Sequence, residues 1–136
     1  MDIENKKRSK KILIIDDERD YTMLLRRKLE PLGCEVVEAS NASEIFRAIM
    51  NESFDLVLLD FAMREIRGDK ICRLIREDEK SKNTPILFVT AYYNVGEEMF
   101  KTYGATDVIY KPVDHGELME KIQKYLGLTS EQGGAL

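Results

Sequence analysis

Three acidic residues follow apolar segments in a pattern that favours metal or phosphate chemistry. Asp16 and Asp17 come directly after the apolar run Ile12–Ile15, and Asp60 comes directly after Leu56–Leu59. Such short runs do not suit a buried helix and are typical of strands in a parallel sheet that is covered on both faces. Because ligands of open parallel sheets bind beyond the carboxyl ends of the strands, these acids are candidates for a site.

Two further apolar segments end in polar residues of other kinds. Thr90 follows Ile86–Val89, and Lys111 closes the segment that contains Val108–Ile109. Only the segment around Val36–Val37 has an ordinary ending. Four of five predicted strands therefore place an acid, a hydroxyl or an amine at one edge of the sheet.

The combination of these groups points to phosphoryl chemistry. Three converging carboxylates repel one another unless a hard cation lies among them, and oxygen ligands with open coordination places suit Mg²⁺. A carboxylate such as Asp60 can attack phosphorus as a nucleophile. Lys111 offers a positive charge for a phosphoryl oxygen and Thr90 a hydroxyl donor. Each residue alone also has a structural interpretation, since Asp17 or Thr90 could cap a helix and Lys111 could be a surface lysine.

Amphipathic helical patterns alternate with the five apolar segments. Their apolar residues recur at helical spacing within 21–32, 42–50, 71–75, 95–103 and 118–126. The five stripes are Tyr21, Leu24, Leu25, Leu29 and Leu32; Ala42, Ile45, Phe46, Ile49 and Met50; Ile71, Leu74 and Ile75; Val95, Met99, Phe100 and Tyr103; and Leu118, Ile122, Tyr125 and Leu126. Unbroken alternation of strand and helix predicts an α/β fold with a doubly wound parallel sheet and helices on both faces.

Local signals mark several helix ends. Gly33 suits the position after the first helix, and Pro31 would lie in its strained last turn. Asn41 and Glu44 form a capping-box pattern, and Asp114 is the expected N-cap of the last helix.

Composition narrows the function further. The chain has 136 residues, enough for one domain, with 43% hydrophobic and 34% charged residues and a net charge of −4. A negative balance argues against general nucleic-acid binding, and no apolar run is long enough for a membrane span. Cys34 and Cys72 have no metal-ligand spacing, so we expect reduced thiols and a cytoplasmic protein.

The marker set Asp16-Asp17, Asp60, Thr90-Ala91 and Lys111-Pro112 resembles the receiver domain of two-component response regulators, in which phosphoryl groups relay signals. The resemblance covers 11–126, leaving 1–10 as a flexible basic arm and 127–136 as a flexible tail. It implies a flavodoxin-like sheet of five parallel strands in the order 2-1-3-4-5 with five helices.

The resemblance also implies roles for the acidic residues. Asp60 would accept a phosphoryl group with Mg²⁺ present. Asp17 would bind the metal directly, Asp16 mainly through water, and Ala62 through its backbone carbonyl. Beyond its own phosphorylation and dephosphorylation, such a domain catalyses no reaction.

The remaining markers would bind and report the phosphoryl group. Lys111 would pair with Asp60 or its phosphoryl group, and Thr90, followed by the small Ala91, would move toward that group as the switch. The Lys111–Pro112 peptide bond would be cis. Ala62 and Tyr92 flank the approach of hydrolytic water in the family. Ala62 offers no hydrogen bond, and Tyr92 would place a bulky ring over the site that excludes water, so we expect slow self-dephosphorylation. A Tyr92 hydroxyl that itself positions the water is the alternative.

The chain departs from the family pattern at two positions. Arg64 replaces the usual proline four residues after the acceptor, although Gly68 is kept. Val108 stands where the family carries a switch aromatic, and Tyr110 lies on the same side by strand alternation. Val108, Tyr110 and the loop residue Tyr93 are therefore the candidates for the output face.

The expected donor is a sensor histidine kinase or a histidine phosphotransfer protein, and the downstream protein partner is open. Output, and a candidate homodimer, would use the surface of the helices within 95–103 and 118–126 and the strand between them. A receiver that signals without phosphorylation remains an alternative. Two other classes of protein fit the sequence less well. An aspartyl-phosphate phosphatase would carry its nucleophile after the first strand, whereas Asp60 follows the third. A flavin protein would need a hydroxyl-rich phosphate loop after the first strand, where this chain has Asp16-Asp17-Glu18.

Overall fold

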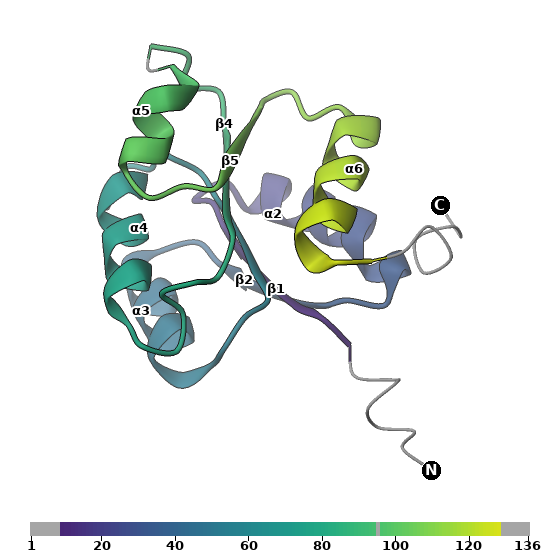
Figure 1. Cartoon of the computed structure of the whole chain (residues 1–136), viewed down its shortest axis with the longest axis horizontal. Helices are drawn as coiled ribbons and strands as arrows, with labels where there is room; N and C mark the ends of the chain where they lie inside the picture. The colour runs from purple at the N-terminus through teal and green to yellow at the C-terminus, as the bar shows by residue number, and fades with distance from the viewer. Residues whose placement is uncertain (1–8, 95, 129–136) are drawn as a thin grey trace.

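A five-stranded parallel sheet forms the centre of the protein (Figure 1). The computed structural model describes residues 9–94 and 96–128. The strands are β1 (Lys11–Ile15), β2 (Glu35–Ala39), β3 (Leu56–Leu59), β4 (Ile86–Thr90) and β5 (Asp107–Tyr110). They lie in the order β2-β1-β3-β4-β5, which confirms the predicted topology.

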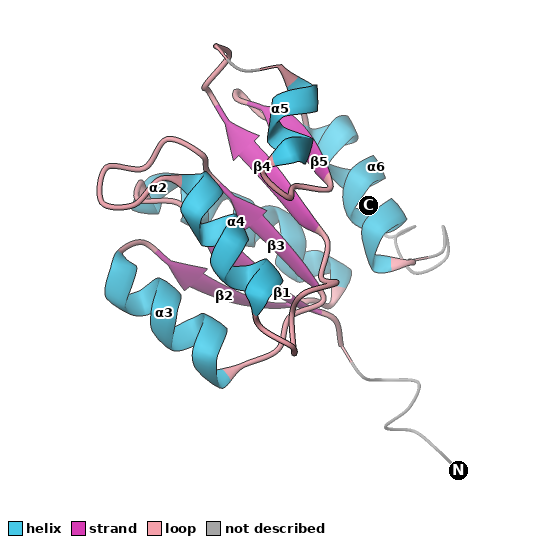
Figure 2. Cartoon of the chain, turned by 60° about the vertical axis from the view of Figure 1, so that its left-hand side comes forward, coloured by secondary structure: helices cyan, strands magenta, loops and turns pink. Residues whose placement is uncertain are grey.

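Helices cover both faces of this sheet. The helices are α2 (Arg19–Leu29), α3 (Ala42–Asn51), α4 (Gly68–Glu77), α5 (Glu97–Thr102) and α6 (His115–Leu126), with a short 3-10 helix at Glu30–Leu32. Figures 1 and 2 show α3, α4 and α5 on one face and α2 and α6 on the other. The five predicted helices are thus present, although Val95, the first residue of the predicted fourth stripe, lies outside the described residues.

Side-chain alternation along each strand builds two separate cores. In β1, Leu13 and Ile15 pack with α3 and α4, whereas Ile12 and Ile14 pack with α2 and α6. All four are at most 1% exposed. Because both faces need apolar side chains, the strand reads as a continuous apolar run.

The predicted helix caps are largely as expected, with one difference at the first helix. The Asn41 side chain accepts from the Glu44 amide, and the Asp114 side chain accepts from the Glu117 amide. Helix α2 ends earlier than predicted, at Leu29, so Pro31 lies in the following 3-10 helix instead of the last α-turn. Proline lacks the N–H that an α-helical turn requires, which explains the change. The glycine at position 33 closes this turn with φ of 85°.

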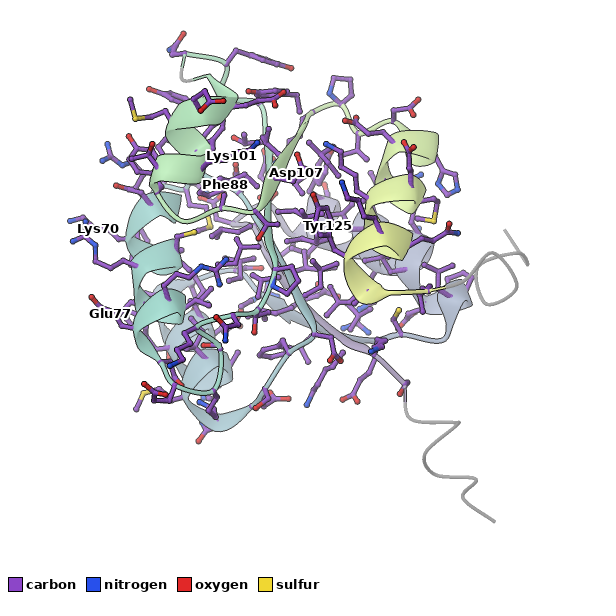
Figure 3. All side chains as sticks on the ribbon, viewed as in Figure 1. Lys70, Glu77, Phe88, Lys101, Asp107 and Tyr125 are labelled. Atoms are coloured by element: carbon purple, nitrogen blue, oxygen red, sulfur yellow. The ribbon has the colours of Figure 1, made fainter. Side chains whose placement is uncertain are left out.

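Several residues of the predicted apolar stripes are exposed. They are Leu24, Phe46, Met50, Leu74 and Met99. A helix packed on a sheet contacts it through a narrow face, so residues at the margin of a stripe stay in solvent. Figure 3 shows this arrangement for α4, whose Lys70 and Glu77 point away from the sheet, while Phe88 of β4 lies inside.

The predicted flexible arm and tail lie largely outside the described residues, which exclude 1–8 and 129–136. Of the tail, Gly127 ends α6 with φ of 70°, and the Leu128 amide donates to the carbonyl of Gln123. Across 9–94 and 96–128 we find no helix with the length and apolar character that a bilayer crossing needs.

Candidate functional site

Strand register brings Asp16 and Asp60 side by side. Ile15 of β1 pairs with Leu59 of β3, so the residues that follow them leave the sheet at the same level. The Asp60 amide donates to the carbonyl of Ile15 at 2.9 Å, which extends the ladder by one step. Backbone pairing thereby holds two acids close together that are 44 positions apart in sequence.

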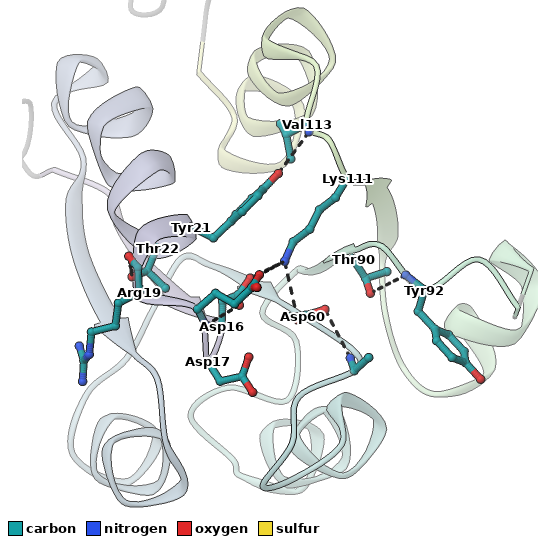
Figure 4. A network of polar contacts seen from close by, with 12 residues as sticks. Asp16, Asp17, Arg19, Tyr21, Thr22, Asp60, Thr90, Tyr92, Lys111 and Val113 are labelled. Atoms are coloured by element: carbon teal, nitrogen blue, oxygen red, sulfur yellow. Dashed lines mark hydrogen bonds and ion pairs between the residues drawn. The ribbon is translucent and has the colours of Figure 1, made fainter.

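Lys111 reaches these acids from the end of β5, the strand at one edge of the sheet. Its amide donates to the carbonyl of Thr90 at the end of β4, and the Lys111–Pro112 peptide bond is cis. The side chain extends back over the strand ends (Figure 4). Its Nζ lies 2.7 Å from Oδ2 of Asp16 and 3.7 Å from Oδ2 of Asp60.

The three acids form a compact set of oxygen donors. One carboxylate oxygen each from Asp16, Asp17 and Asp60 lies within 4.8 Å of the others. Asp16 and Asp60 are buried and Asp17 is half-buried, and Asp17 and Asp60 line an open cleft of about 470 Å³. Oxygen-only donors beside an open cleft fit Mg²⁺, which keeps several of its waters when it binds protein.

Burial and neighbouring charges alter the pKa of two residues at the cluster, Asp16 and Lys111. Burial raises the pKa of Asp16, an effect that the nearby Asp60 reinforces and the hydrogen bond from Lys111 opposes. Burial by itself would lower the pKa of Lys111. The hydrogen bond to Asp16 and the attraction of Asp60 outweigh it, so the pKa of Lys111 is raised. Lys111 therefore stays cationic and offsets part of the repulsion between the acids.

Arg64 is the second cation at the cluster. Its backbone amide donates to Oδ2 of Asp17 at 3.0 Å, and its Nε lies 3.4 Å from the same oxygen. The side chain is 89% exposed, whereas that of Asp17 is 18% exposed. Arg64, which stands where the family usually carries proline, thus directly contacts the predicted metal ligand Asp17.

Thr90 lines the cleft, and its hydroxyl oxygen accepts a hydrogen bond from the loop that follows β4. It is fully buried, and its Oγ1 accepts from the Tyr92 amide at 3.1 Å. The Tyr92 ring packs on Phe61, with 5.0 Å between centroids, and Figure 4 shows it directed away from Asp60. Ala91 and Tyr92 both line the cleft.

The loop after Asp60 is fixed by a close approach to α4. Ala62, which is exposed, donates its amide to Oδ1 of Asp60 at 3.3 Å. Gly68, the first residue of α4, donates to the carbonyl of Phe61 at 2.7 Å. A Cβ at Gly68 would lie 2.7 Å from the Phe61 Cα and 2.8 Å from the Asp60 carbonyl oxygen. Only glycine fits there without displacing the acceptor loop.

Two of the three output-face candidates reach the surface. Tyr93 is 62% exposed and stacks on the half-buried Tyr110 with 5.1 Å between ring centroids. The Tyr93 hydroxyl donates to the carbonyl of Lys111. Val108 is instead 3% exposed and packs in the core under α4 and α5. Its side chain is therefore not available to a partner in this structure.

Sequence reasoning assigned no role to three residues at the site. Glu18 lines the cleft and has a carboxylate oxygen 3.7 Å from Nζ of Lys111; its place in the acidic run after β1 was the available signal. Nζ of Lys111 lies 4.1 Å from the ring centroid of Tyr21 in α2, a contact that no local pattern indicates. Arg64 was visible only as a departure from the family pattern.

Comparison with known proteins identifies the class of this domain. A family model described as the response regulator receiver domain matches residues 12–123. The chain therefore belongs to the response regulator receiver family, the receiver domains of two-component systems.

Individual relatives agree with this assignment. The chain is 36% identical over 129 residues to the probable transcriptional regulator ycf27 of Cyanidium caldarium, a match that covers 93% of this chain and 51% of the relative. It is 34% identical over 124 residues to the phosphate regulon transcriptional regulatory protein PhoB of Pseudomonas aeruginosa, covering 88% and 53%. The chain thus spans about half the length of these curated relatives.

Solved structures show the same fold. The chemotaxis response regulator CheY4 of Vibrio cholerae superimposes with a TM-score of 0.78 and 26% identity, covering 87% of this chain and 99% of that one. The response regulator TrrA of Thermotoga maritima, solved in complex with Mg²⁺-BeF, gives a TM-score of 0.75 and 32% identity, covering 86% and 99%.

Proposed function

We propose that this chain accepts a phosphoryl group on Asp60 from the phosphohistidine of a sensor histidine kinase or a histidine phosphotransfer protein, with Mg²⁺ as cofactor. The observation that carries the proposal is the position of the Asp60 carboxylate. It lies beside two further acids at the floor of an open cleft, 3.7 Å from a lysine ammonium.

The chemistry is an in-line displacement at phosphorus. A carboxylate oxygen of Asp60 forms the new P–O bond while the P–N bond of the donor breaks, and the electron pair of that bond stays on the imidazole nitrogen. The positive charge of Lys111 faces the phosphoryl oxygens, and the open cleft admits the donor from solvent. Position and charge are the main requirements of phosphoryl transfer.

The metal would be held by Asp17 directly, by Asp16 mainly through water, by Asp60 and by the backbone carbonyl of Ala62. When bound, Mg²⁺ neutralises charge between the acceptor carboxylate and the incoming phosphoryl group. The fit of the donor set supports this assignment, as does a relative that was solved in complex with Mg²⁺-BeF.

The switch begins at Thr90, whose hydroxyl oxygen accepts from the Tyr92 amide. If the hydroxyl turns toward a phosphoryl group on Asp60, the Tyr92 amide loses its acceptor and the loop after β4 must rearrange. Tyr93 in that loop is tied to the Lys111 carbonyl and stacks on Tyr110. Phosphorylation would therefore move two aromatic rings at the protein surface.

Output would use the surface formed by α5, β5 and α6. Tyr93, together with the 47% exposed Met99 of α5, offers apolar contact area there. Exposed aromatic rings commonly anchor protein contacts. The same surface is our candidate contact for a downstream protein or for a second copy of the chain.

Intact-mass measurement after incubation with acetyl phosphate tests this function. The wild-type chain with Mg²⁺ should gain one phosphoryl group, and EDTA should prevent the gain. Asp60→Asn should abolish it, because the amide is no longer a nucleophile. Asp55→Asn, which alters an acid before the same strand, is the matched control and should retain labelling. Equal labelling of Asp60→Asn and the wild type would disprove the assignment.

A further inference from the structure

Every acid of the cluster has a cationic side chain of the protein as a partner. Lys111 serves Asp16 and Asp60, with which its Nζ makes contacts of 2.7 and 3.7 Å. Asp17 is served by Arg64, whose Nε lies 3.4 Å from its Oδ2. The protein therefore supplies two positive charges to the cluster, one to Asp16 and Asp60 and the other to Asp17.

The two cations differ in how firmly they are held. The Lys111 side chain is 11% exposed and contacts the ring of Tyr21 as well as the acids. The Arg64 side chain is 89% exposed and, within the described part of the chain, contacts the cluster only through Asp17. Burial makes the lysine a fixed part of the site, whereas the arginine can leave at small cost.

We propose that Arg64 is a positioning residue that pairs with the Asp17 carboxylate and competes with Mg²⁺ for it, so that it lowers the magnesium affinity of this domain. This inference rests on the magnesium site of the proposed function. The guanidinium and the metal require the same carboxylate charge. Binding of one therefore weakens binding of the other.

A second contact, from the backbone amide of Arg64, orients the Asp17 carboxylate. The Arg64 amide donates to the same Oδ2 as the side chain, so the carboxylate is gripped at one oxygen. Among the described residues, Oδ1 of Asp17 has no hydrogen-bond donor. The amide persists in any non-proline variant and keeps the carboxylate oriented, and substitution of the side chain then removes the competing charge alone.

Magnesium titration of three variants, followed by backbone NMR shifts without any phosphoryl donor, tests the inference. Arg64→Gln should bind Mg²⁺ about two- to fivefold more tightly than the wild type, the range expected for loss of an exposed ion pair. Arg64→Lys, which keeps the charge, should stay close to the wild type. Arg67→Gln is the matched control: Arg67 lies in the same loop but pairs with Asp69. Its magnesium affinity should not change.

The Arg64 side-chain resonance separates the specific pair from general surface charge. Asp17→Asn removes the carboxylate and so gives the reference position of an Arg64 guanidinium that has lost this partner. In the wild type, the Arg64 Nε–H resonance should move on Mg²⁺ addition toward its position in Asp17→Asn.

Two results would overturn the inference while leaving the proposed function intact. One is equal Mg²⁺ affinity of Arg64→Gln and the wild type, and the other is an equal gain for Arg67→Gln. A wild-type chain that binds no Mg²⁺ would instead overturn both the magnesium site and the role of Arg64.

Discussion

Nζ of Lys111 donates to Oδ2 of Asp16 at 2.7 Å and so joins the end of β5 to the end of β1 across two intervening strands. The two side chains are 11% and 3% exposed. This contact holds the lysine charge over the strand ends, 3.7 Å from the proposed acceptor Asp60. We therefore expect the stability of the site and its proposed function to depend on the same ammonium group.

Lys111→Met should lower the free energy of unfolding at pH 7 by about 3 kcal/mol, because it leaves a buried carboxylate unpaired. Urea denaturation in EDTA would measure the loss. Lys101→Met, on the exposed side of α5, is the control and should change stability by less than about 0.5 kcal/mol.

The effect of Lys111→Met should depend on pH in a defined direction. The pKa of Asp16 in the folded protein is raised above its ordinary value of 3.8 by burial. The folded state then binds this proton more tightly than the unfolded chain, so its contribution to stability grows as the pH falls and is lost as the pH rises through the folded pKa. The loss caused by Lys111→Met should consequently shrink on acidification. A loss that stays constant from pH 7 to pH 4 would contradict this account.

Gly68→Ala should destabilise the protein by about 2–3 kcal/mol, since the new Cβ would overlap the backbone at Phe61 and Asp60. It should also slow labelling by acetyl phosphate, because the acceptor loop is displaced. Gly96→Ala provides the control. A Cβ there meets no heavy atom within 4 Å, so thermal unfolding should be nearly unchanged. Similar melting temperatures for both variants would show that the contact is not restrictive.

Beryllofluoride, a phosphoryl mimic, should shift backbone NMR resonances mainly at 90–100 and 108–111. Tyr93→Phe removes the hydroxyl that donates to the Lys111 carbonyl, so shifts in β5 should become smaller while those at Asp60 persist. Tyr103→Phe removes the hydroxyl of another ring packed on Phe61 and should leave the pattern intact. If shifts in the wild type stay confined to the three acids, the phosphoryl mimic binds but causes no structural change at the output face.

Self-dephosphorylation should be slow. Ala62 offers no side-chain hydrogen bond to a hydrolytic water, and Tyr92 packs on Phe61 instead of pointing at Asp60. Ala62→Asn together with Tyr92→Glu should shorten the phosphoryl lifetime about tenfold, equivalent to about 1.4 kcal/mol of barrier. Loss of phosphate after donor removal gives the rate, and the single variants separate the two positions. An unchanged or longer lifetime would show that these residues do not control water.

Tyr125 should titrate later than an ordinary tyrosine. Burial and the hydrogen bond that its hydroxyl donates to Oδ2 of Asp107 raise the pKa of Tyr125 to about 12 (the pair is labelled in Figure 3). A raised pKa contributes stability below the ordinary value of 10.0, and this contribution is lost as the pH rises toward 12.

Ultraviolet titration of Asp107→Asn against the wild type checks this assignment. The variant should show one tyrosine ionising nearer pH 10, and its unfolding free energy should fall less steeply between pH 10 and 12. Tyr125→Phe should remove the late step altogether. A late step that survives in Tyr125→Phe belongs to another residue.

The sequence by itself determined where the strands lie and which polar residues follow them. Apolar runs located the five strands because both faces of a parallel sheet require apolar side chains. Since all carboxyl ends of parallel strands meet at one edge, Asp16, Asp60, Thr90 and Lys111 could be predicted to gather there. The caps at Asn41 and Asp114 were equally visible, because they depend on contacts within four residues.

Only the tertiary structure decided which groups touch. Arg64 and Asp17 are 47 positions apart, and Tyr93 and Lys111 are 18 apart. Their contacts depend on loop paths and side-chain rotamers that no periodic pattern encodes. The same holds for exposure: Phe46 and Met99 follow the helical period, yet remain in solvent because the width of the helix–sheet contact is set by neighbouring elements. Local pattern specifies which face a side chain takes, and packing between distant segments specifies its partner.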